Sequence, residues 1–147
     1  MIAFDSNILV YAHQVGDGNR RHERALELVA NAAIAGAIIP IQVLGEFLNV
    51  CRKKLGVAPQ VAVDQVRDYR AAFNCPATAV NDLADAAFLA DRFKLQFFDA
   101  LIASIAERSG ATMLLSEDMH DGLQIESLRV LNPFNPANQA EIATLLA

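Results

Sequence analysis

The chain has few of the residues that would indicate an extracellular, membrane-bound or zinc-binding protein. Its 147 residues include only two cysteines, Cys51 and Cys75, and their separation fits neither a disulfide framework nor a short metal-binding motif. The N-terminus reaches Asp5 before an apolar run develops, which is unlike an export signal. We therefore expect a cytoplasmic protein with two free thiols.

Long hydrophobic runs are also scarce. The longest uncharged stretch covers residues 28–45, and Asn31, Gly36 and Pro40 interrupt it. A transmembrane helix needs about 20 consecutive apolar residues, so this stretch instead predicts a helix end, a short strand and the start of another helix. We expect no membrane association. The hydrophobic fraction of 54% and the charged fraction of 20% are typical of one compact globular domain.

Basic residues are in the minority, since 12 Lys and Arg against 17 Asp and Glu leave a net charge of −5. Affinity for phosphates normally comes from excess positive charge, so this balance argues against general nucleic-acid binding. The objection weakens because basic residues gather in two clusters, Arg20–Arg24 and Arg52–Lys54. Each cluster could contact phosphates or form a solvated helix face. For Arg52–Lys54 the favoured explanation is that positive charges stabilise the C-terminus of a helix.

The chain alternates short apolar runs with segments of helical periodicity. Predicted strands cover Ile2–Phe4, Ala37–Ile39, Ala77–Val80, Thr112–Leu115 and Arg129–Leu131. Predicted helices cover Asn7–Ala12, Arg21–Ala35, Gln42–Leu55, Val61–Phe73, a segment capped by Asn81 or Asp82 and ending at Phe93, and Asp99–Arg108. Strands separated by helices imply a parallel sheet with helices on both faces. We predict a single α/β domain over residues 1–147, with a C-terminal tail from about residue 132.

Two carboxylates follow predicted strands. Asp5 comes directly after the first strand, and Asp118 follows the strand Thr112–Leu115 by three residues. The carboxyl ends of parallel strands meet at one edge of a sheet, where functional sites form, so we expect the two side chains to converge. Each also has an ordinary explanation, because Asp5 could cap the next helix and Asp118 could be a solvated loop residue.

Two further acids stand in apolar surroundings. At about 100° per residue, Glu46 falls at the edge of the apolar face of the helix Gln42–Leu55, which predicts a half-buried carboxylate. Asp99 begins a largely apolar helix, either as its N-cap or as a group that needs a partner to stay ionised. Converging acids repel unless a cation neutralises them, and a site without His or Cys favours Mg²⁺ or Mn²⁺ over zinc.

Five segments across nearly the whole chain carry a family signature. They are Ile2–Ala12, Gln42–Phe47, Phe98–Ala103, Leu115–Met119 and Val130–Phe134. In this order and spacing they resemble the motifs of PIN-domain nucleases, and in particular of VapC-type toxins.

The resemblance implies a PIN fold and an endoribonuclease that uses Mg²⁺, for which Mn²⁺ can substitute. A metal-activated water would hydrolyse RNA phosphodiesters and leave 5′-phosphate and 3′-hydroxyl ends. The expected partners are an RNA substrate, an antitoxin protein and a second copy of the chain in a homodimer. The resemblance assigns catalytic, metal-binding roles to Asp5, Glu46, Asp99 and Asp118, and supporting roles to Asn7 and Ser116.

Other residues near this set are left open. Glu117 and Asp121 add acids near the proposed site, and Asp121 is better explained as a turn residue before Gly122. The three histidines, His13, His22 and His120, are expected to be incidental, although His120 is close enough in sequence to Asp118 to touch substrate.

Other functions are also open. The domain could process RNA without a toxin role, or be a non-catalytic PIN-like binding module. A phosphotransferase with Asp5 as nucleophile is disfavoured, because Asn7 occupies the position of its second Asp and the later strands offer no convincing lysine.

Overall fold

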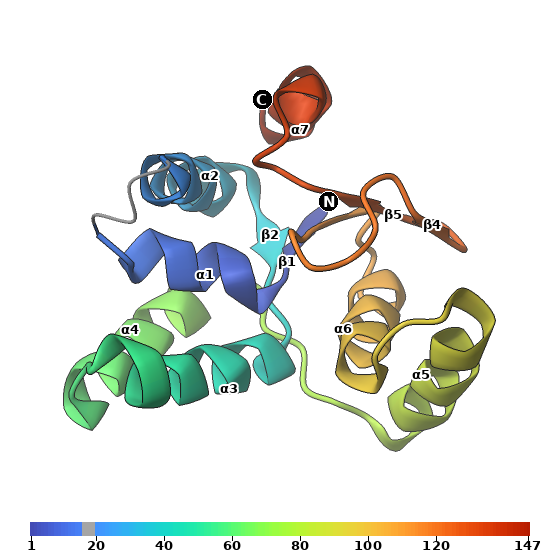
Figure 1. Cartoon of the computed structure of the whole chain (residues 1–147), viewed down its shortest axis with the longest axis horizontal. Helices are drawn as coiled ribbons and strands as arrows, with labels where there is room; N and C mark the ends of the chain where they lie inside the picture. Colours follow the sequence, from blue (N-terminus) through green and yellow to red (C-terminus); the bar gives the residue numbers. More distant parts are fainter. Residues whose placement is uncertain (16–19) are drawn as a thin grey trace.

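The computed structural model describes residues 1–15 and 20–147, and its centre is a mostly parallel sheet (Figure 1). Within the described residues the strand order is β2-β1-β3-β5-β4, with β5 paired to β4 antiparallel and the other pairs parallel. The strands are β1 (Ile2–Phe4), β2 (Ala37–Ile38), β3 (Met113–Leu115), β4 (Gln124–Ile125) and β5 (Leu128–Leu131). The predicted α/β architecture is confirmed.

Helices connect the parallel strands and flank the sheet. They are α1 (Ser6–His13), α2 (Arg21–Ala35), α3 (Ile41–Val50), α4 (Pro59–Ala72), α5 (Val80–Phe93), α6 (Phe97–Arg108) and α7 (Gln139–Leu146), with a π-helical turn η1 (Cys51–Leu55) and a 3₁₀ turn η2 (Pro136–Asn138). In Figure 1, α1 to α4 group beside β1 and β2, while α5 and α6 form a second group on the other side. None of the described helices has the length and apolarity that crossing a membrane requires.

The register of the sheet brings three strand ends to one level. Phe4 of β1 pairs with Leu115 of β3, which pairs in turn with Leu131 of β5. All three side chains are buried, and burying an apolar side chain of this size contributes about 1.5–3 kcal/mol. The packed core therefore holds the residues that follow these strands at the same edge of the sheet.

The predicted boundaries before α5 are wrong. The structure has no strand at residues 77–80, and α5 begins at Val80 with Ala79 as its N-cap. Asp82 is the third residue of the helix, and its carboxylate accepts a hydrogen bond from the Ala79 N–H at 2.7 Å. Neither Asn81 nor Asp82 is the cap, because the capping contact is made from inside the first turn.

Two other local predictions differ from the structure. Helix α6 begins two residues before Asp99, with Gln96 as its N-cap, so Asp99 is not a cap. The predicted tail folds into η2 and α7, and Ile142 of α7 is buried. The short strand β4 was not predicted, because two residues are too few to show an alternating pattern.

Candidate active site

Asp5 lies at the carboxyl end of β1 and is almost completely buried, with 1% of its surface exposed. One carboxylate oxygen accepts the N–H of Ser6 at 2.7 Å, so Asp5 caps α1. The other oxygen accepts the Ser116 hydroxyl, also at 2.7 Å. The capping interpretation is therefore correct, and the same side chain also contacts the end of β3.

The environment of Asp5 disfavours its negative charge. Burial raises the pKa of Asp5 to about 7, and the charges of Asp99 and Glu46 add to this shift. Hydrogen bonds from Ser116 and Ser6 act in the opposite direction but do not compensate fully. A cation near these carboxylates would relieve both the burial and the repulsion.

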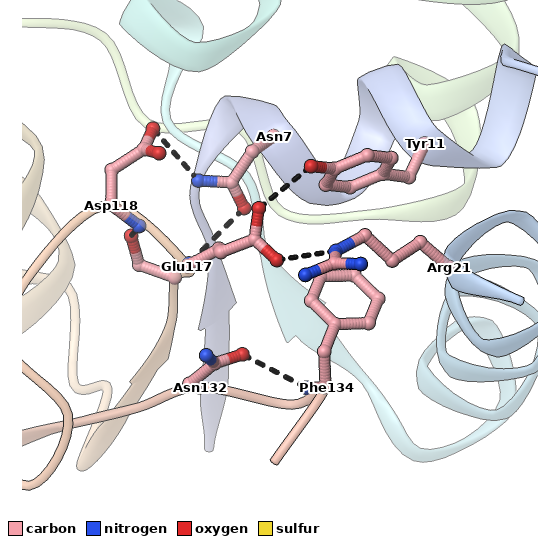
Figure 2. Close-up of polar contacts among 8 residues, drawn as sticks. Asn7, Tyr11, Arg21, Glu117, Asp118, Asn132 and Phe134 are labelled. Carbon is pink, nitrogen blue, oxygen red and sulfur yellow. Dashed lines mark hydrogen bonds and ion pairs between the residues drawn. The ribbon is translucent and has the colours of Figure 1, made fainter. Parts of the chain in front are cut away.

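Asp5 is linked to Asp118 through side chains at the end of β3. The buried hydroxyl of Ser116 donates to Asp5 and accepts the N–H of Asp118 at 3.2 Å. The Asn7 amide of α1 donates to the exposed Asp118 carboxylate at 3.0 Å, as Figure 2 shows. Four of the six predicted site residues thus form one hydrogen-bonded chain between the ends of β1 and β3.

Glu46 and Asp99 approach this chain from α3 and α6. Both are half-buried, as the periodicity of α3 predicted for Glu46, and Glu46 accepts a hydrogen bond from Gln42 at 3.2 Å. Burial raises the pKa of Asp99, and the charges of Asp118 and Glu46 raise it further. Asp99 is therefore within charge range of Asp5, Glu46 and Asp118, and Asp5 is within charge range of Glu46.

The donor chemistry of these residues fits a hard divalent cation. All four acids offer carboxylate oxygens, which Mg²⁺ and Mn²⁺ prefer, and their mutual repulsion would fall once a cation was bound. Within residues 1–15 and 20–147, however, no three or more His, Cys, Asp or Glu side chains are grouped so that they could hold a metal ion.

Two clefts meet at Asp118. The larger, about 670 Å³, is lined by Asp99 and Asp118 together with His120 and Lys94. The smaller, about 350 Å³, is lined by Asn7, Tyr11, Lys54 and Asp118. An extended ligand lying in both clefts would pass Asp118 and meet one lysine on each side.

Neither of the two additional acids lines these two clefts. The Glu117 carboxylate contacts Tyr11 and Arg21. The Asp121 carboxylate accepts hydrogen bonds from the Asn132 N–H and the side chains of Asn135 and Asn138. Although burial acts to raise it, these hydrogen bonds lower the pKa of Asp121. Its role in the structure is to anchor the segment after β5.

The contact of Arg21 and Tyr11 with Glu117 was not predicted from the sequence. The cluster Arg20–Arg24 had suggested phosphate contacts or a solvated face, yet Arg21 pairs with Glu117 and Arg24 pairs with Glu27. The sequence offered one sign of this contact, the Arg-rich start of α2. The acid that Arg21 meets is set by the packing of α2 beside α1, which the sequence does not show.

Comparison with protein families matches residues 2–120 to the PIN domain. No match was found among curated protein sequences. Among solved structures, the toxin VapC20 of Mycobacterium tuberculosis, described as cleaving the sarcin-ricin loop, is 18% identical with a TM-score of 0.65, over 80% of this chain and 92% of VapC20. A toxin-antitoxin complex from Klebsiella pneumoniae is 22% identical with a TM-score of 0.64, over 90% and 98% of the two chains. VapBC2 from Rickettsia felis, bound to promoter DNA, is 19% identical with a TM-score of 0.65, over 90% and 98%. These likenesses show the fold.

Proposed function

Because this chain belongs to the PIN domain family, we propose that it is a Mg²⁺-dependent endoribonuclease, with Mn²⁺ able to substitute, and the toxin of a toxin–antitoxin pair. The observation that carries the proposal is the hydrogen-bonded chain from Asp5 through Ser116 to Asp118 and Asn7. It stands within charge range of Glu46 and Asp99, at the sheet edge where parallel sheets carry their sites.

In this proposal Asp5, Glu46, Asp99 and Asp118 hold the divalent ion. When bound, the ion would lower the pKa of a water molecule and stabilise charge on phosphoryl oxygens. The Ser116 hydroxyl orients the carboxylate of Asp5, and the Asn7 amide orients that of Asp118. No protein nucleophile is required, because the attacking group is water and the leaving group is a ribose oxygen.

The substrate would be single-stranded or splayed RNA. The two clefts that meet at Asp118 are open enough for an extended strand, and Lys54 and Lys94 line them. Positive charges on both sides of the acids would hold phosphates despite the net charge of −5. His120 lines the larger cleft and is placed to touch the same strand.

The direct test compares wild type with Asp5→Asn on a panel of transcripts, with Mg²⁺ or Mn²⁺. Asn keeps the size of the side chain and an oxygen for the Ser6 N–H, so the fold should survive. Removing a ligand itself should lower the cleavage rate by at least the roughly 10–100-fold that loss of an outer supporting residue typically costs. Asp85→Asn, in an exposed position on α5, is the control. Equal RNA cleavage by wild type and Asp5→Asn, or no cleavage by either protein, would refute the proposed nuclease function.

The toxin role is supported by the toxin–antitoxin complexes that share this fold. Expression of the chain alone should arrest growth, and co-expression of an adjacent small gene encoding a DNA-binding protein should restore it. The Asp5→Asn variant should not arrest growth. A chain that cleaves RNA without arresting growth would instead be an RNA-processing nuclease.

We also expect a homodimer. Val80, Leu83 and Phe88 are exposed on α5, with 83%, 45% and 75% of their surfaces accessible, and they lie on one face at helical spacing. A second copy could cover this face. Sedimentation equilibrium should show a dimer for wild type and a monomer for Phe88→Glu, whereas a wild-type monomer would contradict this part of the proposal.

A further inference from the structure

Glu117 occupies the position between two proposed site residues, Ser116 and Asp118. In Figure 2 its carboxylate points toward α1 and α2, whereas that of Asp118 points toward Asn7. Its backbone N–H also donates to the side-chain oxygen of Asn7 at 3.4 Å. The three consecutive residues after β3 are therefore held from different directions.

Both oxygens of the Glu117 carboxylate are used. One accepts the Tyr11 hydroxyl at 2.6 Å, and the other accepts the Arg21 Nε–H at 2.5 Å. Burial raises the pKa of Tyr11 to about 12, helped by Glu117, so the hydroxyl remains a donor throughout the physiological range. Hydrogen bonds of this charge-assisted kind are roughly twice as strong as neutral ones.

Arg21 is itself fixed by aromatic rings. Its guanidinium carbon lies 5.7 Å from the centre of the Tyr11 ring and 5.4 Å from that of Phe134. The two rings meet edge to face, with centres 5.2 Å apart. The Arg21 side chain is 32% exposed and that of Glu117 21%, so this pair is better shielded than a surface salt bridge, whose contribution is typically below about 1 kcal/mol.

The cluster joins three parts of the chain to the loop after β3. Tyr11 comes from α1, Arg21 from the start of α2, and Phe134 from the segment after β5. Asp118 is exposed, and its side chain has one hydrogen bond, from Asn7. Besides this bond and the contact of its backbone N–H with Ser116, the position of Asp118 depends on how firmly its neighbour Glu117 is held.

We propose that Arg21, Tyr11 and Glu117 form a positioning cluster that fixes Asp118 for divalent-cation binding, so that this cluster sets the affinity of the site for its metal. The inference rests on the proposed nuclease function. Arg21 also balances the charge of Glu117, which keeps a fifth carboxylate from adding repulsion at the metal site. In this proposal Glu117 is not itself a metal ligand and acts through its neighbour Asp118. Tyr11 also lines the smaller cleft, so the test reads metal binding in the absence of RNA.

The test measures Mn²⁺ binding by loss of the free-ion EPR signal, which needs no catalysis, together with the Mg²⁺ concentration that half-saturates RNA cleavage. Outer residues that orient metal ligands typically alter affinity about 10–100-fold. Glu117→Ala should weaken Mn²⁺ binding and raise the Mg²⁺ half-saturation point by roughly tenfold. The limiting rate at saturating Mg²⁺ should change less than about twofold, since Asp118 itself is retained.

Two further variants keep the test decisive. Tyr11→Phe removes one oxygen and should give a smaller shift in the same direction, even if Glu117→Ala proves unstable. Glu27→Ala, which removes the ion pair between the exposed Glu27 and Arg24 on the same helix as Arg21, should match wild type. Thermal unfolding of each variant separates loss of folded protein, which lowers the limiting rate, from loss of metal affinity.

If folded Glu117→Ala and Tyr11→Phe bind Mn²⁺ with the affinity of wild type, the inference is overturned. The proposed nuclease function would stand in that case. A wild-type chain that neither binds Mn²⁺ nor cleaves RNA would refute the nuclease and this inference with it.

Discussion

At the scale of single residues, Asp5 combines a structural and a proposed chemical task. Its carboxylate caps α1 and accepts the Ser116 hydroxyl, which accounts for its burial. Its negative charge is disfavoured in that position. A residue that is helpful as a hydrogen-bond acceptor and costly as an anion is well suited to bind a cation, because the ion removes the cost and leaves the hydrogen bonds intact.

This cost predicts the pH dependence of stability in metal-free buffer. The ordinary pKa of the Asp5 carboxyl is 3.8, and in the folded chain it is about 7. Between these values the folded state binds more protons at Asp5 than the unfolded state, so the contribution of Asp5 to stability is greatest below about pH 4 and declines until about pH 7. The decline should be on the order of a few kcal/mol.

Urea denaturation of wild type and Asp5→Asn with EDTA, at pH 4 to 8, measures this contribution. The difference in unfolding free energy between the two should move in favour of the variant as pH rises. A difference that is flat across this range would show that Asp5 does not titrate with a raised pKa.

At the scale of helices, α5 and α6 are joined by a salt bridge at their ends. Arg108 of α6 donates two hydrogen bonds of 2.7 Å to Asp82 of α5 and one of 3.0 Å to the Ala77 carbonyl. The Asp82 side chain is 1% exposed. The guanidinium is the largest cause of the lowered pKa of this carboxyl, so the pair contributes stability that is present above about pH 4 and lost as pH falls further.

Removing Arg108 should therefore destabilise the chain more than removing an exposed arginine. Arg108→Met leaves the Asp82 charge with only the Ala79 N–H. Because the Arg108 side chain is 43% exposed, the cost should lie between the roughly 1 kcal/mol of a surface pair and the roughly 3 kcal/mol of a buried one. Thermal or urea unfolding at pH 7 gives the value, with Arg67→Met in its exposed position on α4 as the control. Equal stability of the two variants would contradict a structural role for this pair.

The π-helical turn η1 offers a matched comparison for RNA binding. Lys54 lines the smaller cleft beside Asp118, whereas its exposed neighbour Lys53 does not line either of the two clefts at Asp118. Lys54→Ala should reduce RNA affinity and lower the salt slope of binding by about one charge, while Lys53→Ala should do neither.

Binding is measured on catalytically inactive Asp5→Asn protein with a fluorescent RNA. Equal losses for both lysines would indicate a general electrostatic effect in place of a strand path through the cleft.

At the scale of the whole molecule, the net charge of −5 favours cation binding, and binding must stabilise the folded chain if the unfolded chain binds weakly. At a Mg²⁺ concentration one hundred times the dissociation constant, the gain is about 2.7 kcal/mol. This corresponds to a rise of several degrees in melting temperature for a domain of this size.

Differential scanning calorimetry at fixed ionic strength tests this expectation. Mg²⁺ and Mn²⁺ should raise the melting temperature of wild type, and the rise should be lost in Asp5→Asn. An equal rise in both proteins would place cation binding elsewhere on the acidic surface.

Hydrophobic periodicity, a local property, was enough to predict the α/β class, most helices and the positions of Asp5 and Asp118 after strands. It also placed Glu46 at the edge of a buried face.

Periodicity did not determine the start of α5 or α6, because their first turns are set by Asp82 reaching back to Ala79 and by Gln96 as a cap. The contact of Glu117 with Arg21 and Tyr11 arises from the three-dimensional packing. The same holds for the bond of Asp121 to the C-terminal segment and for the link that Ser116 makes between Asp5 and Asp118. These contacts join residues distant in sequence, and the register of β1 with β3 and the packing of α2 beside α1 bring them together.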